Sequence, residues 1–167
     1  MGCLPDFYPG YQPVADPVAR RRFETAWGGV LPSQPGLSLV KIIDAIHRGE
    51  IKALYLIGED LLTNIPNTNW VREALRKLEL LIVQDIFPTE TAHLAHFILP
   101  SATFAEKDGT FTNTERRVQR VRAAVNTVKN SRPDWWIVCQ LTKRMGADGF
   151  DFTHPSQIMT ELSRLIP

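Results

Sequence analysis

The sequence predicts an α/β fold: an open, mostly parallel sheet flanked by helices, with an irregular proline-rich arm at the N-terminus. Three short apolar runs, at residues 53–57, 80–83 and 97–99, have the length and composition of buried strands. A helical pattern precedes each run, and parallel strands need such crossover connections. The expected helices cover residues 38–49, 67–78 and 89–94.

The sequence also predicts two parts, an N-terminal arm with little regular secondary structure and an α/β domain. Residues 1–36 contain six prolines, which prevent long regular elements except for a helix over 17–27. Residues 37–167 form the expected α/β domain, and 167 residues suffice for one compact domain overall. Beyond the strands we expect a turn-rich polar segment over 105–118, then helices from Asp134 to Met145 and from Pro155 to Leu165.

Composition excludes several classes of function. Nineteen Lys and Arg residues against 18 Asp and Glu residues give a net charge of +1, so we expect no nucleic-acid partner. No apolar stretch approaches the roughly 20 residues that span a bilayer, so we expect no membrane segment. Cys3 and Cys139 lie far apart, without a disulfide or zinc spacing, and Cys139 fits a buried apolar position. A cytoplasmic location is the resulting expectation.

Polar residues follow the first two predicted strands. Gly58, Glu59 and Asp60 come after the first strand, and Gln84 and Asp85 after the second. The carboxyl ends of parallel strands meet at one edge of a sheet, where ligands bind. A carboxylate there could accept hydrogen bonds from N1 and N2 of guanine. Acidic residues after strands are also common as helix caps and solvated loop residues, and this alternative stays open.

A polar segment over residues 104–119 contains Lys107, which could reach a phosphate or ribose near the strand ends. Asn113, Glu115 and Arg116 could hold this segment by hydrogen bonds. An exposed loop with an ordinary surface ion network is the competing interpretation. These residues by themselves do not decide between the two.

The same segment carries a resemblance. The run FAEKDGTFTNTERRVQ, preceded by LPSAT, resembles the molybdopterin oxidoreductase family and, within it, the catalytic (alpha) subunit of formate dehydrogenase. MGCLPDFYPGYQPV, YLIGED and LIVQDIFPTETAHLA resemble that subunit in the same order, so the similarity covers nearly the whole chain. The resemblance implies a Rossmann-like domain of the formate dehydrogenase and DMSO reductase type. It further implies that this domain binds one guanine dinucleotide of a bis(molybdopterin guanine dinucleotide) centre holding molybdenum or tungsten.

The resemblance also selects residues for cofactor binding. Carried over one position at a time, the family's contacts fall on Gly58, Glu59, Asp60, Gln84, Asp85, Lys107 and Asp134. Two positions depart from the family pattern. Leu61 stands where a proline usually follows the Gly-Glu-Asp turn, and His96 stands where an aspartate usually precedes the third strand. We expect His96 to be a packing or loop residue.

The implied activity belongs to a longer protein. In the whole enzyme, formate is oxidised to carbon dioxide and the electrons pass to iron–sulfur clusters. The metal ligand and a 4Fe–4S cluster lie in regions other than this chain, so we expect no catalytic or metal-binding residue here and no activity of the isolated chain. The expected partners are the remaining domains of the catalytic subunit and the electron-transfer subunits.

Three alternatives stay open: a non-catalytic structural module of a respiratory complex, part of another molybdopterin oxidoreductase such as a nitrate reductase, and an ordinary mononucleotide-binding domain. A phosphate-cradling glycine motif, which the last would need, is absent from the sequence.

Overall fold

The structure, a computed structural model, describes residues 4–166. The chain divides into two compact units. The sheet unit comprises residues 38–107 and 123–137, and the hairpin unit comprises the described residues up to 37, residues 108–122, and the described residues from 138 onward. The sequence predicts a different division, into an irregular arm over residues 1–36 and an α/β domain over residues 37–167. That division stays a prediction. Cys3 lies outside the described residues.

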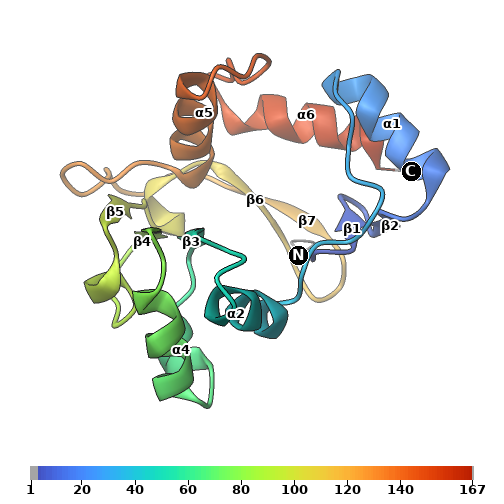
Figure 1. Ribbon diagram of the computed structural model, residues 1–167. Helices are drawn as coiled ribbons and strands as arrows, with labels where there is room; N and C mark the ends of the chain where they lie inside the picture. The colour runs from blue at the N-terminus through green and yellow to red at the C-terminus, as the bar shows by residue number, and fades with distance from the viewer. Residues whose placement is uncertain (1–3, 167) are drawn as a thin grey trace. The chain divides into compact units, whose positions relative to one another are not determined.

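The sheet unit is built around three parallel strands in the order β3-β4-β5. These strands are β3 (Ala53–Ile57), β4 (Leu80–Asp85) and β5 (Phe97–Pro100), and Figure 1 shows β4 between the other two. The predicted α/β class with a parallel sheet is therefore confirmed. The register aligns Tyr55 with Ile82 and Ile57 with Gln84, and it ends with Gly58 N donating to Gln84 O at 2.8 Å.

One face of the sheet is covered by two helices. Alternation along the strands turns Leu56, Leu81 and Val83 toward the core. There they pack with Ile43 and Val71, from helices α2 (Leu39–His47) and α4 (Thr68–Arg76), and both of these side chains are fully buried. Tyr55, Ile82 and Gln84 occupy the alternate positions and so belong to the opposite face.

The connections of the sheet unit follow the predicted order with two differences. A short helix, α3 (Leu61–Asn64), follows β3 and was not predicted. The helix expected over residues 89–94 is shorter, a 3₁₀ turn η1 (Ala92–Leu94). One turn is enough here because the link between β4 and β5 is short.

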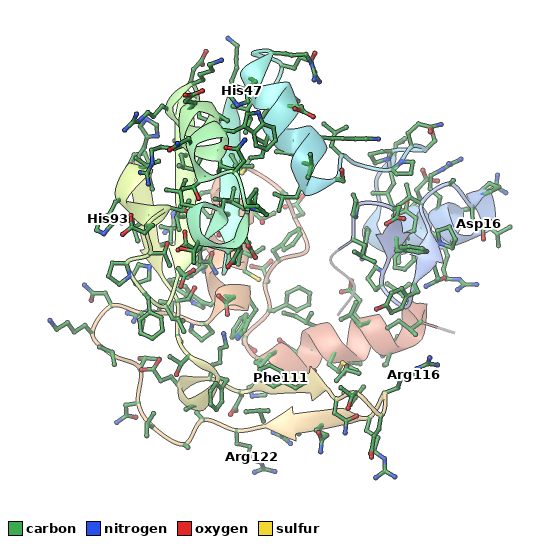
Figure 2. The ribbon with its side chains drawn as sticks, turned by 90° about the horizontal axis from the view of Figure 1, so that it is seen from below. Asp16, His47, His93, Phe111, Arg116 and Arg122 are labelled. Atoms are coloured by element: carbon green, nitrogen blue, oxygen red, sulfur yellow. The ribbon has the colours of Figure 1, made fainter. Side chains whose placement is uncertain are left out.

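Two histidines of the sheet unit, His47 and His96, connect neighbouring segments. His47, labelled in Figure 2, ends α2. Its ring stacks on Trp70 with centroids 5.5 Å apart, and its Nε2 lies 2.9 Å from Trp70 O, which ties the end of α2 to α4. His96 Nδ1 accepts a hydrogen bond from Leu81 N at 2.9 Å. His96 is an exposed residue that lies just before β5 and binds the backbone of β4, so of the two expected roles, packing or loop, it has the loop role. His93 lies in η1 with its side chain exposed.

The hairpin unit has a smaller core. It contains β1 (Phe7–Tyr8), β2 (Gln12–Pro13), α1 (Pro17–Trp27) and α6 (Pro155–Leu165). Asp16 caps α1 by accepting from Val18 N at 2.9 Å, so the helix predicted over 17–27 is confirmed. Phe23 is fully buried and stacks on Tyr8 at 4.7 Å, and Leu165 belongs to the same cluster.

The segment predicted as a turn-rich loop is an antiparallel hairpin. Its strands are β6 (Gly109–Thr112) and β7 (Val118–Val121), and Figure 2 shows Phe111 on the first strand and Arg116 at the turn. Arg116 has a φ of 64°, and Asn113 Oδ1 accepts from Arg117 N at 2.9 Å. Asn113 therefore does hold the turn, as predicted. The polar strand residues hid the hairpin in the sequence because neither strand has a buried face of alternating apolar side chains.

Candidate functional site

A cluster of polar side chains lies at the carboxyl end of the sheet, around Asp134. Helix α5 (Asp134–Arg144) begins at this residue. The segment before it is bonded to the end of β5, since Arg132 N donates to Pro100 O at 3.1 Å and Ala102 N donates to Arg132 O at 2.8 Å. These backbone bonds bring Asp134 next to a strand residue 50 positions earlier in the chain, Gln84.

Asp134 accepts hydrogen bonds from three side chains. Gln84 Nε2 and Ser101 Oγ each donate to Oδ1 at 2.8 Å. Lys107 Nζ donates to Oδ2 and completes an ion pair. Tyr55 OH donates to Gln84 Oε1, which leaves the amide nitrogen of Gln84 directed at Asp134. We call these five residues the Asp134 cluster.

A short 3₁₀ helix fixes the backbone before Lys107. This helix, η2 (Phe104–Glu106), begins with a capping box in which Thr103 N donates to Glu106 Oε2 at 2.7 Å. Glu106 Oε1 also accepts from Val128 N at 2.9 Å, which attaches the chain before α5 to the same turn. Glu106 therefore serves the backbone, and the next residue, Lys107, extends to Asp134.

The electrostatics of the cluster favour a charged Asp134. Burial by itself raises the pKa of Asp134, but hydrogen bonds from Lys107, Ser101 and Gln84 outweigh burial and hold the pKa below its ordinary value. The pKa of Tyr55 is raised, first by burial and then by the negative charge of Asp134, so the phenol stays a hydrogen-bond donor. Gln84 is fully buried and Ser101 nearly so, whereas the side chains of Lys107 and Asp134 are 23% and 36% exposed. The charged pair is thus the part of the cluster that a ligand can reach.

The three residues after β3 form a separate group, the Asp60 turn. Asp60 Oδ1 accepts from Thr91 N at 3.1 Å and from Thr91 Oγ1 at 2.5 Å, and Oδ2 accepts from Thr63 Oγ1 at 2.6 Å. Glu59 Oε1 accepts from Asn64 Nδ2 at 2.8 Å. Gly58 has a φ of 64°, a left-handed conformation that favours glycine. The carboxylates of this turn bind α3 and the start of η1.

Asp85 ends β4, and strand alternation turns its side chain away from that of Gln84. One carboxylate oxygen accepts from Phe87 N at 3.1 Å, which turns the chain after the strand. Asp85 is partly exposed at the same edge of the sheet.

The structure therefore brings together three of the seven residues selected from sequence, Gln84, Lys107 and Asp134. Gly58, Glu59 and Asp60 form their own group, and Asp85 lies on the other face of β4. Two members of the cluster were missed as site residues, Tyr55 and Ser101. A signal existed for Tyr55, because it carries a hydroxyl in an apolar strand and lies level with Ile82, two residues before Gln84, on the same face of the sheet, where a partly buried hydroxyl needs a partner.

The described residues hold no group of three or more His, Cys, Asp or Glu side chains that could hold a metal ion. Cys139 is buried, as predicted, and burial raises the pKa of its thiol. Among the helices described for this chain, none combines the length and apolar character needed to cross a membrane.

Comparison with known proteins identifies the class to which this fold and cluster belong. The family model described as "Molybdopterin oxidoreductase" matches residues 10–144, which include the whole sheet unit with its Asp134 cluster and part of the hairpin unit. The chain belongs to the molybdopterin oxidoreductase family.

Relatives narrow this class. The chain is 45% identical to "Putative formate dehydrogenase YrhE" of Bacillus subtilis (strain 168) and 47% identical to "Putative formate dehydrogenase SH0748" of Staphylococcus haemolyticus (strain JCSC1435). Each alignment covers all 167 residues of this chain and 17% of the relative. The chain thus corresponds to about a sixth of the length of these relatives.

A solved structure supports the fold independently. Acetylene hydratase from Pelobacter acetylenicus superimposes with a TM-score of 0.61 over 80% of this chain and 19% of its own, at 19% sequence identity. At this identity the likeness concerns the fold alone.

Proposed function

We propose that this chain binds one guanine dinucleotide of a molybdopterin cofactor, within a longer protein that oxidises formate to carbon dioxide. The observation that carries the proposal is the Asp134 cluster, in which a carboxylate and a lysine lie side by side at the carboxyl end of a parallel sheet. Membership of the family and the names of the relatives supply the cofactor class and formate.

The donors and acceptors of the cluster fit the end of such a cofactor. Guanine presents two adjacent N–H donors, N1 and N2, and a carboxylate accepts both. Lys107 supplies a cation for a phosphate oxygen. The cluster keeps its carboxylate ionised and oriented, because Gln84 and Ser101 hold Oδ1 and Tyr55 orients Gln84. Four predicted contacts lie outside the cluster. Asp85 is at the end of β4 but on the opposite face from Gln84. Gly58, Glu59 and Asp60 follow the end of β3, the strand next to β4.

The chain's part in the reaction is positioning. When bound, the cofactor with its molybdenum or tungsten would supply the two-electron chemistry, and a 4Fe–4S cluster elsewhere in the longer protein would be the electron acceptor. Asp134 and Lys107 would hold the nucleotide end of the cofactor, so that errors of position there would affect the reacting centre. We expect the isolated chain not to oxidise formate, and a cytoplasmic location stays a prediction.

Calorimetric titration of the chain with GMP, GDP and AMP tests the site. We expect GMP and GDP to bind at least tenfold more tightly than AMP, because adenine offers a donor and an acceptor where guanine offers two donors. GDP should bind more tightly than GMP through Lys107. Equal affinities for GMP and AMP, or absence of binding, would contradict the proposal.

In the longer protein, replacing Asp134 or Asp85 by alanine should lower cofactor occupancy and leave turnover per bound metal unchanged. Metal content and formate oxidation measured on the same preparation separate these quantities. Full occupancy with low activity would contradict a purely positioning role.

A further inference from the structure

The two oxygens of Asp134 are held in different ways. Oδ1 accepts from Gln84 Nε2 and Ser101 Oγ, two neutral donors on buried side chains. Within residues 4–166, the donor to Oδ2 is Lys107 Nζ, and Lys107 is a partly exposed side chain with a flexible four-carbon stem. A partner of Oδ1 leaves only if the end of the sheet rearranges, whereas the partner of Oδ2 leaves by rotation of one side chain.

A guanine edge needs the oxygen that Lys107 occupies. Two adjacent N–H donors bind a carboxylate best when each meets a different oxygen, as in bidentate pairs with arginine. Oδ1 has two donors already, so the bidentate arrangement depends on Oδ2. Once displaced, Lys107 would be an unpaired cation beside the nucleotide, and the phosphates carry the compensating charge.

We propose that Lys107 and the guanine edge compete for Oδ2 of Asp134, and that guanine binding transfers Lys107 from Asp134 to a phosphate of the same nucleotide. This inference rests on the proposed function. It makes Lys107 a determinant of specificity as well as a phosphate contact. Adenine cannot place two donors on a carboxylate and therefore cannot replace the lysine, so the ion pair excludes it.

The competition predicts opposite effects of one substitution on two ligands. In Lys107→Met the oxygen is no longer occupied, so guanosine, which has no phosphate, should bind about fivefold more tightly than to the unsubstituted chain. GDP should bind about tenfold more weakly, because the phosphate loses its cation. NMR shift titration of the 167-residue chain with guanosine, adenosine and GDP measures all three affinities.

The alternatives give different results. If Lys107 contacts phosphate without competing, guanosine affinity stays unchanged in Lys107→Met while GDP affinity falls, which overturns the proposal. If Lys107 only orients the carboxylate, both affinities fall, which also overturns it. If the unsubstituted chain shows no preference for guanosine over adenosine, the proposed function itself fails, and this inference fails with it.

Two controls keep the test decisive. Lys52→Met removes an exposed lysine of the same unit, paired with Glu79 Oε1 at 2.8 Å, and should change neither affinity. The carboxyl ¹³C titration of Asp134 needs no ligand: its pKa should rise in Lys107→Met and stay unchanged in Lys52→Met. An Asp134 pKa that does not respond to Lys107→Met would overturn the proposal, even if the variant folds less stably.

Discussion

Two acidic residues at the carboxyl edge of the sheet unit, Asp60 and Asp134, look alike in the sequence and differ in the structure. Asp60 accepts from Thr63 Oγ1 and from the backbone and hydroxyl of Thr91. Its partners are neutral, and Thr91 is fully buried. Asp134 accepts from side chains of three different segments, and one of its donors is the ammonium group of Lys107.

We interpret Asp60 as a structural carboxylate and propose Asp134 as the binding one. Hydrogen bonds from Thr63 and Thr91 hold the Asp60 carboxylate between α3 and η1, and a ligand that took those bonds would leave buried Thr91 groups unpaired. The Asp134 side chain is partly exposed, and the lysine that donates to its Oδ2 can exchange without breaking the backbone structure. Both residues lie where a helix begins, so sequence position does not separate them, but the kind of partner does.

Exchanging each carboxylate for an amide tests this distinction most directly. Asp134→Asn should weaken GMP binding about a hundredfold, about 2.7 kcal/mol, because an amide presents a donor where guanine needs an acceptor. Asp60→Asn should leave GMP affinity within about twofold. Calorimetric titration of both variants measures this, and equal losses of affinity would mean that the two carboxylates share one site.

Truncation of Asp60 should affect the stability of the fold, whereas the amide exchange at Asp134 affects GMP binding. Asp60→Ala leaves the buried N–H and hydroxyl of Thr91 without their acceptor, so the free energy of unfolding should fall by about 2 kcal/mol. Urea unfolding followed by circular dichroism measures it. A fall below about 0.5 kcal/mol would show that the turn does not depend on this carboxylate.

Removal of the Tyr55 hydroxyl should have a smaller effect on both stability and GMP affinity, because Tyr55 acts on Asp134 only through Gln84. Tyr55→Phe takes one hydrogen bond from Gln84 and should lower the free energy of unfolding by about 1 kcal/mol. GMP affinity should fall several-fold as well, because the Gln84 amide then turns more freely. Phe97→Leu, a change at an exposed residue of β5, serves as the control and should leave GMP affinity unchanged.

Lowering the pH should remove the contribution of Asp134 to the free energy of unfolding. Its pKa is lowered in the folded chain, so its ionised form stabilises the fold fully above the ordinary carboxyl pKa of about 4, and this contribution is lost as pH falls through the folded pKa. The stability difference between the unsubstituted chain and Asp134→Asn should therefore shrink below about pH 4. Unfolding at a series of pH values measures it, and a difference independent of pH would contradict the ion pair with Lys107.

The main elements of the sheet unit follow from local patterns. The strands over residues 53–57 and 97–99, the Ser38 and Asn67 helix starts and the parallel arrangement are all visible in apolar runs and helical periods. The hairpin β6-β7 and the helix α3 are not, because short or polar elements have no apolar period. Their stability depends on contacts that only the folded chain supplies.

The candidate site shows the same division. The sequence by itself determined the fold class, through local apolar and helical patterns, and the family, through its resemblance. That resemblance selected Gln84, Lys107 and Asp134 among seven candidate contacts. Only the tertiary structure decided that these three meet and that Tyr55 and Ser101 join them, while Asp60 binds Thr91 instead. The physical reason is range: Gln84 and Asp134 are 50 residues apart, and the bonds between residues 100–102 and Arg132 that bring them together have no local signature.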